Sequence, residues 1–355
     1  MPTTTKLCDR FPEVPADQLI AGFVPPPQFA QVSLDSYIPD PAWPSQAAAV
    51  ERLRAMSSTF AQGSAPRGNA HAKRSLLGRK KKDKKGAKSK QNAGPGGVYL
   101  DGGFGVGKTH LLASLYSIAS LDTTTPKAAF GSFVEYTNLV GALGFEHAVD
   151  VLSQFDLVCI DEFELDDPGD TVLISSLLAR LAERGVFLAA TSNTLPDKLG
   201  EGRFAAEDFM REIQGLSSIF EVIRIDGEDY RHRDLDQVPA PATPDEVDEA
   251  AASEGATRDS FADLLGHLAQ VHPSRYGAMV ADVDTVCLDD VCTLEDQSQA
   301  LRLVALVDRL YDAQVIVVAS GVPLDQVFSQ DMLAGGYRKK YRRAISRLTA
   351  MASSD

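Results

Sequence analysis

From residue 97 onward, short runs of apolar residues alternate along the chain with longer stretches in which apolar residues recur every three or four positions. The short runs predict buried strands, and the longer spacing predicts helices that pack against them. The predicted strands are residues 98–100, 157–160, 186–190 and 221–226, and the helices between them include residues 111–118 and 173–181. Strands that alternate with helices form a parallel sheet with helices on its faces, so we expect an α/β core over residues 97–235.

Two segments on either side of this core have other patterns. Residues 1–60 begin with a proline-rich stretch, which predicts extended backbone, and apolar residues then recur at helical spacing over residues 45–56. We expect residues 1–60 to pack on the core as an extended and helical segment. Residues 236–257 combine prolines with a run of acidic residues, a composition that is typical of a linker.

A smaller unit is expected over residues 258–355. It contains a predicted strand at 286–288, a helix at 299–311, a strand at 315–319 and a basic terminal helix at 337–348. At a constant offset of 128 positions, seven residues of the core recur in this unit, among them Cys159 as Cys287 and Asp161 as Asp289. The recurrence indicates either an internal duplication or only the apolar pattern that any two strand-helix-strand units share.

Charge is distributed unevenly along the chain. Overall, 35 lysines and arginines stand against 49 aspartates and glutamates, for a net charge of −14, which argues against general binding to nucleic acid or to an anionic membrane. Residues 61–96 are the exception, because Lys73 to Lys90 alone contain ten basic residues and one acidic residue, a net +9 that leaves −23 for the rest. This segment is predicted to be a disordered lysine-rich insertion, either a solvated loop that rests on the acidic body or a contact for a polyanion or partner.

The strongest chemical signal lies at the start of the core. Residues 102–109 read Gly-Gly-Phe-Gly-Val-Gly-Lys-Thr, a complete phosphate-loop motif between a predicted strand and a predicted helix. The glycines let backbone N–H groups face phosphates, Lys108 is placed to reach the β- and γ-phosphates, and Thr109 to bind Mg²⁺. The predicted nucleotide-binding residues are Gly102, Gly103, Phe104, Gly105, Val106, Gly107, Lys108, Thr109 and His110.

Polar residues that a nucleotide hydrolase needs follow the next predicted strands. Residues 157–160 lead directly into Asp161 and Glu162, and residues 186–190 lead into Thr191, Ser192 and Asn193. We expect Asp161 to hold Mg²⁺ together with Thr109, and Glu162 to polarise the attacking water. A polar side chain at Asn193 is expected to contact the γ-phosphate or the water. The sequence therefore predicts a Mg²⁺-dependent ATPase.

Other classes of protein are disfavoured. The four cysteines are scattered, and no cysteine or histidine pair has the spacing of a metal site or a nucleophile motif. The first residues lack the apolar segment of a signal peptide, and no window approaches the 18 apolar residues of a membrane helix. These features predict a reduced, cytoplasmic protein.

The motifs and their flanking residues resemble the ZapE family of AAA+ ATPases, which includes a mitochondrial lactation-elevated ATPase. The resemblance covers most of residues 30–352 apart from the lysine-rich insertion, and it is carried by residues 97–109, 159–170, 190–199, 225–231, 306–312 and 345–348. The ordered set of Asp-Glu-Phe, Asp-Tyr-Arg, Leu-Tyr-Asp and Ser-Arg-Leu is its specific part. It implies a P-loop NTPase fold of the AAA+ class, a parallel sheet flanked by helices, with a smaller C-terminal domain that is either α/β or a helical lid.

The resemblance also implies roles for single residues. Lys108 and Thr109 correspond to Walker A, Asp161 and Glu162 to Walker B, and Asn193 to sensor 1. The arginine after the sensor residue is replaced by Thr194. The roles of three arginines stay open. Arg203 is preferred over Arg211 as the arginine finger that acts on a neighbouring subunit. Arg347 is either an in-chain second sensor or part of a solvated basic face. Tyr37, Ile38 and Gln46 either line an adenine pocket or only anchor the N-terminal segment.

The family resemblance points to a homo-oligomeric ATPase that remodels a protein partner. For bacterial members the implied partner is FtsZ at the constricting cell-division ring, and for mitochondrial members the implied process is membrane-protein quality control, which leaves peripheral membrane contact open. The basic insertion and basic terminal helix motivate an alternative, a nucleic-acid-handling AAA+ protein of the helicase-loader type. No helix-turn-helix and no basic patch interleaved with aromatic residues supports this alternative.

Overall fold

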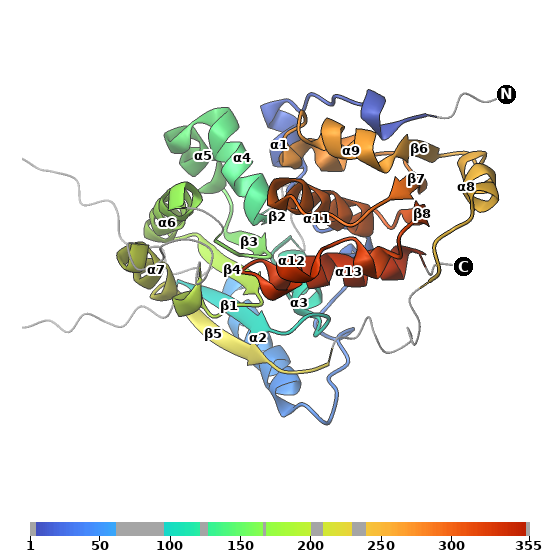
Figure 1. Ribbon diagram of the computed structural model, residues 1–355. Helices are drawn as coiled ribbons and strands as arrows, with labels where there is room; N and C mark the ends of the chain where they lie inside the picture. The colour runs from blue at the N-terminus through green and yellow to red at the C-terminus, as the bar shows by residue number, and fades with distance from the viewer. Residues whose placement is uncertain are drawn as a thin grey trace, which may run out of the picture.

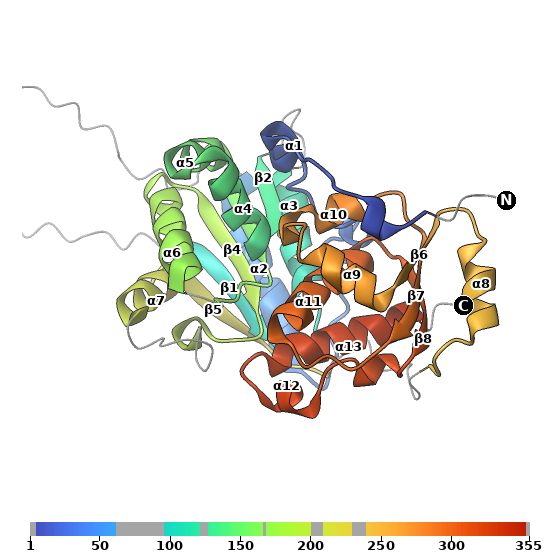
Figure 2. The ribbon, with the colours of Figure 1, turned by 45° about the horizontal axis from the view of Figure 1, so that its top comes forward.

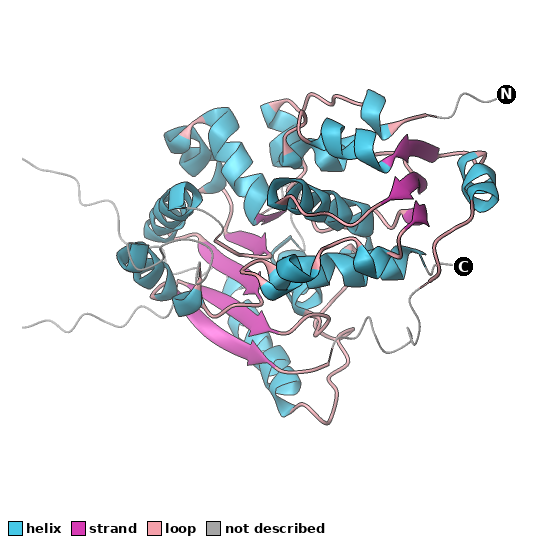
Figure 3. Cartoon of the chain, in the orientation of Figure 1, coloured by secondary structure: helices cyan, strands magenta, loops and turns pink. Residues whose placement is uncertain are grey.

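The computed structural model of the chain describes residues 5–61, 96–120, 127–165, 168–199, 209–228 and 239–352. These residues form two parallel sheets, one of five strands and one of three, at opposite sides of the molecule (Figures 1 and 3). Helices α11, Gln297–Asp312, and α13, Arg338–Ala352, run between the two sheets (Figures 1 and 2). The predicted lysine-rich insertion lies outside the described residues apart from its two ends.

The core sheet has the strand order β2-β3-β4-β1-β5, with every pair parallel. Its strands are β1 Gly97–Gly102, β2 Ala128–Ser132, β3 Leu157–Asp161, β4 Phe187–Ser192 and β5 Phe220–Ile225. Strands β1 and β3 are buried along nearly their whole length, which explains why they are continuous apolar runs in the sequence. Because all strands are parallel, their carboxyl ends meet at one edge of the sheet, where ligands of such folds bind.

Helices cover both faces of this sheet. They are α2 Pro44–Ala61, α3 Lys108–Ser120, α4 Phe133–Leu143, α5 Phe145–Leu152, α6 Pro168–Glu183 and α7 Met210–Ser217. Helix α2 packs against α3 and β5, so the predicted helix at 45–56 does belong to the layer that covers the core. Helix α4 begins with a capping box in which Ser132 and Glu135 exchange hydrogen bonds, and the left-handed Gly144 separates it from α5. The P-loop NTPase architecture predicted from the sequence is confirmed.

The C-terminal unit is itself α/β, so the helical lid that the family resemblance left open is not observed. Its sheet has the order β6-β7-β8, all parallel. The elements besides α11 and α13 are α8 Pro244–Ala251, β6 Ala256–Ser260, α9 Phe261–Leu268, α10 Tyr276–Met279, β7 Thr285–Val291, β8 Ile316–Gly321 and α12 Gln330–Ala334. The larger apolar core of this unit is built mainly from α9, α11, α13, β7 and β8, and a smaller cluster joins Val247 and Ala251 of α8 to Cys287 of β7.

Two segments outside the core differ from what the sequence led us to expect. The acidic, proline-containing segment expected to be a linker instead forms α8 and the start of β6, and α8 packs on the second sheet. Thr243 caps this helix in a capping box with Glu246, and Pro244 occupies its first turn, so the prolines and acidic residues mark a helix start. The first residues of the chain pack on the C-terminal unit and not on the core, because Asp259 accepts hydrogen bonds from the backbone N–H groups of Leu7 and Cys8, at 2.9 and 3.1 Å.

The correspondence at an offset of 128 residues extends far beyond the seven residues seen in the sequence. Strand β2 pairs with β3 from Ala128 opposite Leu157, and β6 pairs with β7 from Ala256 opposite Thr285, which is the same register moved by 128. The sequence α4-β3-α6-β4-α7 of the core is matched in order by α9-β7-α11-β8-α13. The C-terminal unit therefore repeats the half of the core that carries β2, β3 and β4, without the phosphate loop.

Among the described residues, no helix combines the length and the apolar character that a bilayer crossing requires.

Candidate functional site

The phosphate loop connects β1 to α3 at the carboxyl edge of the core sheet. The ammonium group of Lys108 lies inside the loop and donates to the carbonyl oxygens of Gly102 and Gly103, at 3.1 and 2.5 Å, and to the side-chain oxygen of Asn193 at 2.7 Å. These acceptors are neutral oxygens, so they orient the ammonium without cancelling its charge. Lys108 and Asn193, which the sequence assigns to two different motifs, therefore lie at one place in the structure.

The N-terminal segment closes over the loop. The hydroxyl of Tyr37 donates to the carbonyl of Val106 at 2.8 Å, and burial raises its pKa to about 12. Gly107 has φ +83°, and a Cβ there would lie 2.5 Å from the Tyr37 ring, so only glycine fits under this ring. His110 packs its ring near Tyr37, and its Nε2 atom lies within hydrogen-bond distance of the Ser33 carbonyl and the Ser36 hydroxyl.

Thr109, Asp161 and Thr191 form a cluster of oxygen atoms next to Lys108. The hydroxyl of Thr109 donates to Asp161, at 3.1 and 3.2 Å from the two carboxylate oxygens, and the hydroxyl of Thr191 donates to the same carboxylate at 2.5 Å. Burial and the neighbouring charge of Glu162 raise the pKa of Asp161, and the two hydroxyl groups oppose this shift. The cluster joins the loop, β3 and β4.

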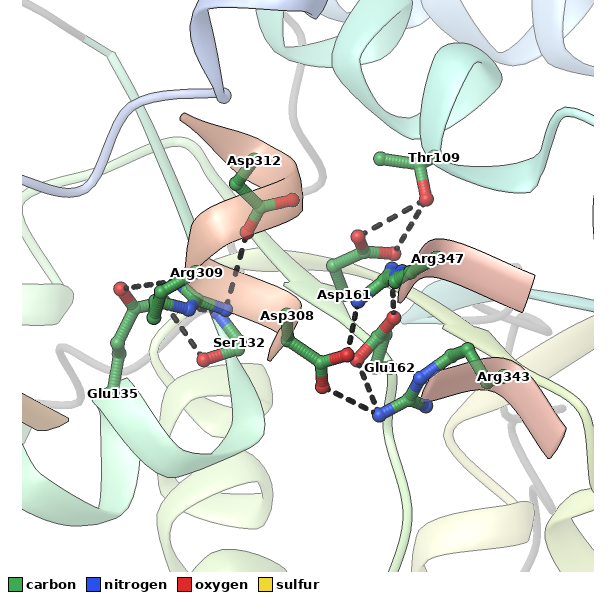
Figure 4. Close-up of polar contacts among 10 residues, drawn as sticks. All are labelled: Thr109, Ser132, Glu135, Asp161, Glu162, Asp308, Arg309, Asp312, Arg343 and Arg347. Carbon is green, nitrogen blue, oxygen red and sulfur yellow. Dashed lines mark hydrogen bonds and ion pairs between the residues drawn. The ribbon is translucent and has the colours of Figure 1, made fainter. Parts of the chain in front are cut away.

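Glu162 follows β3 in a left-handed conformation, with φ 54°, which is uncommon for a residue with a side chain. Thr191 supports this turn, because its hydroxyl accepts from the Glu162 N–H at 3.0 Å and its carbonyl accepts from the N–H of Phe163 at 2.7 Å. Backbone strain of this kind persists only where the surroundings fix it, and it is common in active sites. Here it directs the Glu162 side chain toward the C-terminal unit (Figure 4).

Two arginines from α13 and one aspartate from α11 meet Glu162 there. Arg347 lies 2.7 Å and Arg343 3.1 Å from the Glu162 carboxylate, and both guanidinium groups also bind Asp308, with Arg343 at 2.6 Å (Figure 4). Arg343, Arg347 and Asp308 expose only 5%, 8% and 6% of their surface, so the basic terminal helix is not simply a solvated face. Burial would raise the pKa of Glu162, but the charges of Arg343 and Arg347 outweigh it and hold that pKa well below its ordinary value.

A second ion pair lies beside this cluster. Arg309 on α11 binds Glu135 of α4 at 3.1 Å and lies 3.4 Å from Asp312 (Figure 4). Burial raises the pKa of Asp312 to about 7, although the positive charge of Arg309 acts in the opposite direction. Because Glu135 belongs to the core and Arg309 to the C-terminal unit, this pair is another link between the two.

These groups surround a pocket of about 450 Å³. Its lining includes the predicted residues Phe104 to His110, Asp161, Glu162 and Asn193. Tyr37, Ile38 and Gln46 line it from the N-terminal segment, and Tyr311, Asp312, Arg343 and Arg347 line it from the C-terminal unit. Gly102 and Gly103 are not among the lining residues, but their carbonyl oxygens accept hydrogen bonds from Lys108, which is. The pocket is thus shared between the core and the C-terminal unit.

The sequence left two candidates for the arginine finger. Arg203 is outside the described residues, and Arg211 on α7 is exposed and does not line the pocket. The sequence analysis missed Arg343, Asp308 and Asp312. The available signal was the spacing of four between Arg343 and Arg347, which places both on one face of a helix.

The order of the strands explains how the motifs meet. Strand β4 lies between β1, which precedes the phosphate loop, and β3, which precedes Asp161 and Glu162, so all three contribute to one edge of the sheet. A phosphate loop and a carboxylate pair on this sheet define a P-loop NTPase.

Comparison with known proteins gives a narrower assignment: the chain belongs to the AFG1-like ATPase family, whose family model matches residues 30–256 and 245–355. The chain is 28% identical over 301 residues to the cell division protein ZapE of Escherichia coli K12, covering 73% of this chain and 78% of that protein. It is 25% identical to the lactation elevated protein 1 homolog B of Danio rerio, covering 68% of this chain and 58% of that protein. The resemblance to the ZapE family is confirmed.

Solved structures are more distant. The DnaC helicase loader matches with a TM-score of 0.37 and 15% identity, over 56% of this chain and 99% of that one. The replication initiator DnaA bound to AMPPCP and single-stranded DNA matches with a TM-score of 0.40 and 11% identity, over 90% of this chain and 91% of that one.

Proposed function

We propose that the pocket between the core and the C-terminal unit binds ATP and hydrolyses it to ADP and phosphate, with Mg²⁺ as the cofactor. The observation that carries this proposal is the convergence of Lys108, Asn193, Asp161 and Glu162 on one pocket that is closed by Arg347. In this assignment Lys108 and the backbone of residues 102–107 hold the phosphates, and Asn193 orients Lys108. Glu162 polarises the attacking water and receives its proton.

The residues present suit Mg²⁺. Thr109 and Asp161 bring a hydroxyl and a carboxylate within 3.2 Å of each other beside the phosphate loop, and oxygen ligands of this kind are the ones that Mg²⁺ prefers. Bound there, the ion would neutralise charge on the phosphates. Thr191 holds the Asp161 carboxylate in place through its hydroxyl group.

Hydrolysis by this mechanism is tested by measuring phosphate release. We expect release that requires Mg²⁺ and stops when the metal is chelated. Lys108→Ala is expected to abolish nucleotide binding, whereas Arg342→Ala, on the exposed face of α13, is expected to leave it unchanged. Release that persists in the Lys108→Ala protein would contradict the assignment.

We infer further that hydrolysis drives motion of the C-terminal unit against the core and that this motion remodels a protein partner. The support is that residues of both units line the nucleotide pocket and that the contacts between the units include buried ion pairs at Glu162. A change at the nucleotide therefore changes the contact between the units. We also propose that the protein works in the cytoplasm as a homo-oligomer, which membership of this family supports, and that Arg203 or Arg211 acts on a neighbouring subunit.

For the partner we propose FtsZ at the division ring, because the relative with 28% identity is named a cell division protein. The test is co-sedimentation of the Glu162→Gln protein with FtsZ polymers, since this variant is expected to bind ATP and stall before hydrolysis. Pelleting with polymers in ATP but not in ADP is the expected result. If the protein stays in the supernatant with both nucleotides while it still binds ATP, FtsZ is not the direct partner and membrane-protein clients become the next candidates.

A nucleic-acid-handling role has less support. Part of its motivation was the basic terminal helix, and two of that helix's arginines, Arg343 and Arg347, are buried in ion pairs inside the protein. A DNA-binding role requires affinity that falls steeply with salt, which a filter-binding titration measures directly.

A further inference from the structure

Glu162 and the arginines that bind it come from different parts of the protein. Glu162 follows β3 in the core, whereas Arg343 and Arg347 lie one turn apart on α13 of the C-terminal unit (Figure 4). Asp308 on α11 binds both arginines from the other side. Two buried cations are therefore shared by two carboxylates, and only one of these carboxylates belongs to the proposed hydrolytic machinery.

The same two arginines are available to a bound nucleotide. Both line the pocket that contains Lys108 and Thr109, and so does Glu162, so the arginines border both Glu162 and the space assigned to ATP. A guanidinium group carries five N–H donors, and among the described residues the Nε atoms of both arginines have no hydrogen-bond partner although they are buried. Buried donors without partners are costly, and an anionic ligand that enters the pocket would satisfy them.

We propose that Arg343 and Arg347 form a two-position switch on Glu162. Without nucleotide they hold Glu162 in ion pairs; when ATP binds they transfer to the γ-phosphate, and Glu162 becomes free to orient water. This inference rests on the proposed ATPase function. It adds Arg343 as a second catalytic cation beside Arg347, and it makes Asp308 a positioning residue that keeps the two arginines in place during the transfer.

The switch has a thermodynamic consequence, because Glu162 and the γ-phosphate compete for the same cations. Removing the negative charge of Glu162 by Glu162→Gln should tighten the binding of a non-hydrolysable ATP analogue by about tenfold, the value of one charge-assisted hydrogen bond. ADP has no γ-phosphate and makes the same contacts in both proteins, so its affinity for Glu162→Gln should stay within about twofold of its affinity for the wild type. Arg343→Gln should weaken the analogue by about tenfold and leave ADP unchanged.

The test is a double-mutant cycle on nucleotide affinity, measured by calorimetry with the ATP analogue and with ADP. The four proteins are the wild type, Glu162→Gln, Arg343→Gln and the double variant. The switch predicts that Glu162→Gln tightens the analogue much less when Arg343 is already absent, so the two effects are not additive. Arg342→Gln, the same substitution on the exposed face of α13, is the matched control and should change neither affinity.

Additive effects, or an equal change for the analogue and for ADP, would overturn the switch while the ATPase function stands. A wild-type protein that binds neither nucleotide would instead overturn the proposed function itself. If Arg343→Gln does not fold, Arg343→Lys replaces it in the cycle, because lysine keeps the charge but loses the forked donors. That variant is expected to retain analogue binding with a reduced dependence on Glu162, and full coupling in it would contradict a role for the fork.

Discussion

The cluster of ion pairs that Arg343 and Arg347 form with Glu162 and Asp308 is expected to stabilise the folded protein strongly. Asp308 is 6% exposed and accepts from Arg343 at 2.6 Å and from Arg347. Asp308→Asn keeps the shape of the side chain but leaves two buried guanidinium groups with Glu162 as the remaining carboxylate of the cluster. Removing one partner of a buried ion pair costs about 3–5 kcal/mol, because the other charge stays desolvated.

This cost should appear as a fall of about 10 °C in the melting temperature of the nucleotide-free protein, since 1 kcal/mol shifts a domain of this size by a few degrees. The assay is thermal unfolding followed by circular dichroism. Asp290→Asn is the matched control: it is the same substitution on an exposed residue of the C-terminal unit, and asparagine tolerates the left-handed backbone at that position. If Asp308→Asn melts within about 2 °C of the wild type, the cluster does not stabilise the contact between the units as argued.

Three further predictions concern single positions around the site. Thr191→Val removes the hydroxyl that binds Asp161 while it keeps the shape of the side chain, so kcat for ATP hydrolysis should fall at least about tenfold. Thr191→Ser keeps the hydroxyl and should restore kcat, and equal rates for the two variants would contradict this role. Gly107→Ala would place a Cβ 2.5 Å from Tyr37 at φ +83°, so an ATP titration should show KM raised more than about tenfold, and an unchanged KM would show that the ring can move aside. The pKa of Asp312 is raised to about 7, above its value in the unfolded chain, so its contribution to stability is complete at acid pH and is lost as the pH rises through 7. Urea titrations should therefore show a loss of about 2 kcal/mol in the free energy of unfolding between about pH 5 and about pH 8 in the wild type, and a smaller loss in Asp312→Asn. Parallel curves for the two proteins would contradict this prediction.

Most of the core sheet was predictable because its strands are apolar runs buried on both faces. Strand β2, with the sequence Ala-Ala-Phe-Gly-Ser, was missed because its small residues give no apolar run. Strand β6 was missed because it carries Arg258 and Asp259, whose charges are satisfied by Asp289 and by the backbone of Leu7. Charged residues hide a strand when their partners come from distant parts of the chain.

The part of the site that lies in local motifs was predictable from the sequence, and the part that depends on helix packing was not. The phosphate loop, Asp161 and Glu162 are local motifs with fixed relations to strands, so spacing alone locates them. Arg343 and Asp308 become part of the site only because α11 and α13 pack against each other and against the core, and no local pattern encodes that contact. The basic helix looked like a solvated face because sequence periodicity does not show which face of a helix is covered.

In the proposed mechanism, Glu162 acts in ATP hydrolysis within a pocket shared by the two units. The most direct test compares phosphate release and ATP binding in the wild type and in Glu162→Gln. We expect the variant to bind ATP at least as tightly as the wild type while its turnover falls at least about 100-fold, the usual contribution of a general base. A Glu162→Gln protein that releases phosphate at the wild-type rate would contradict it.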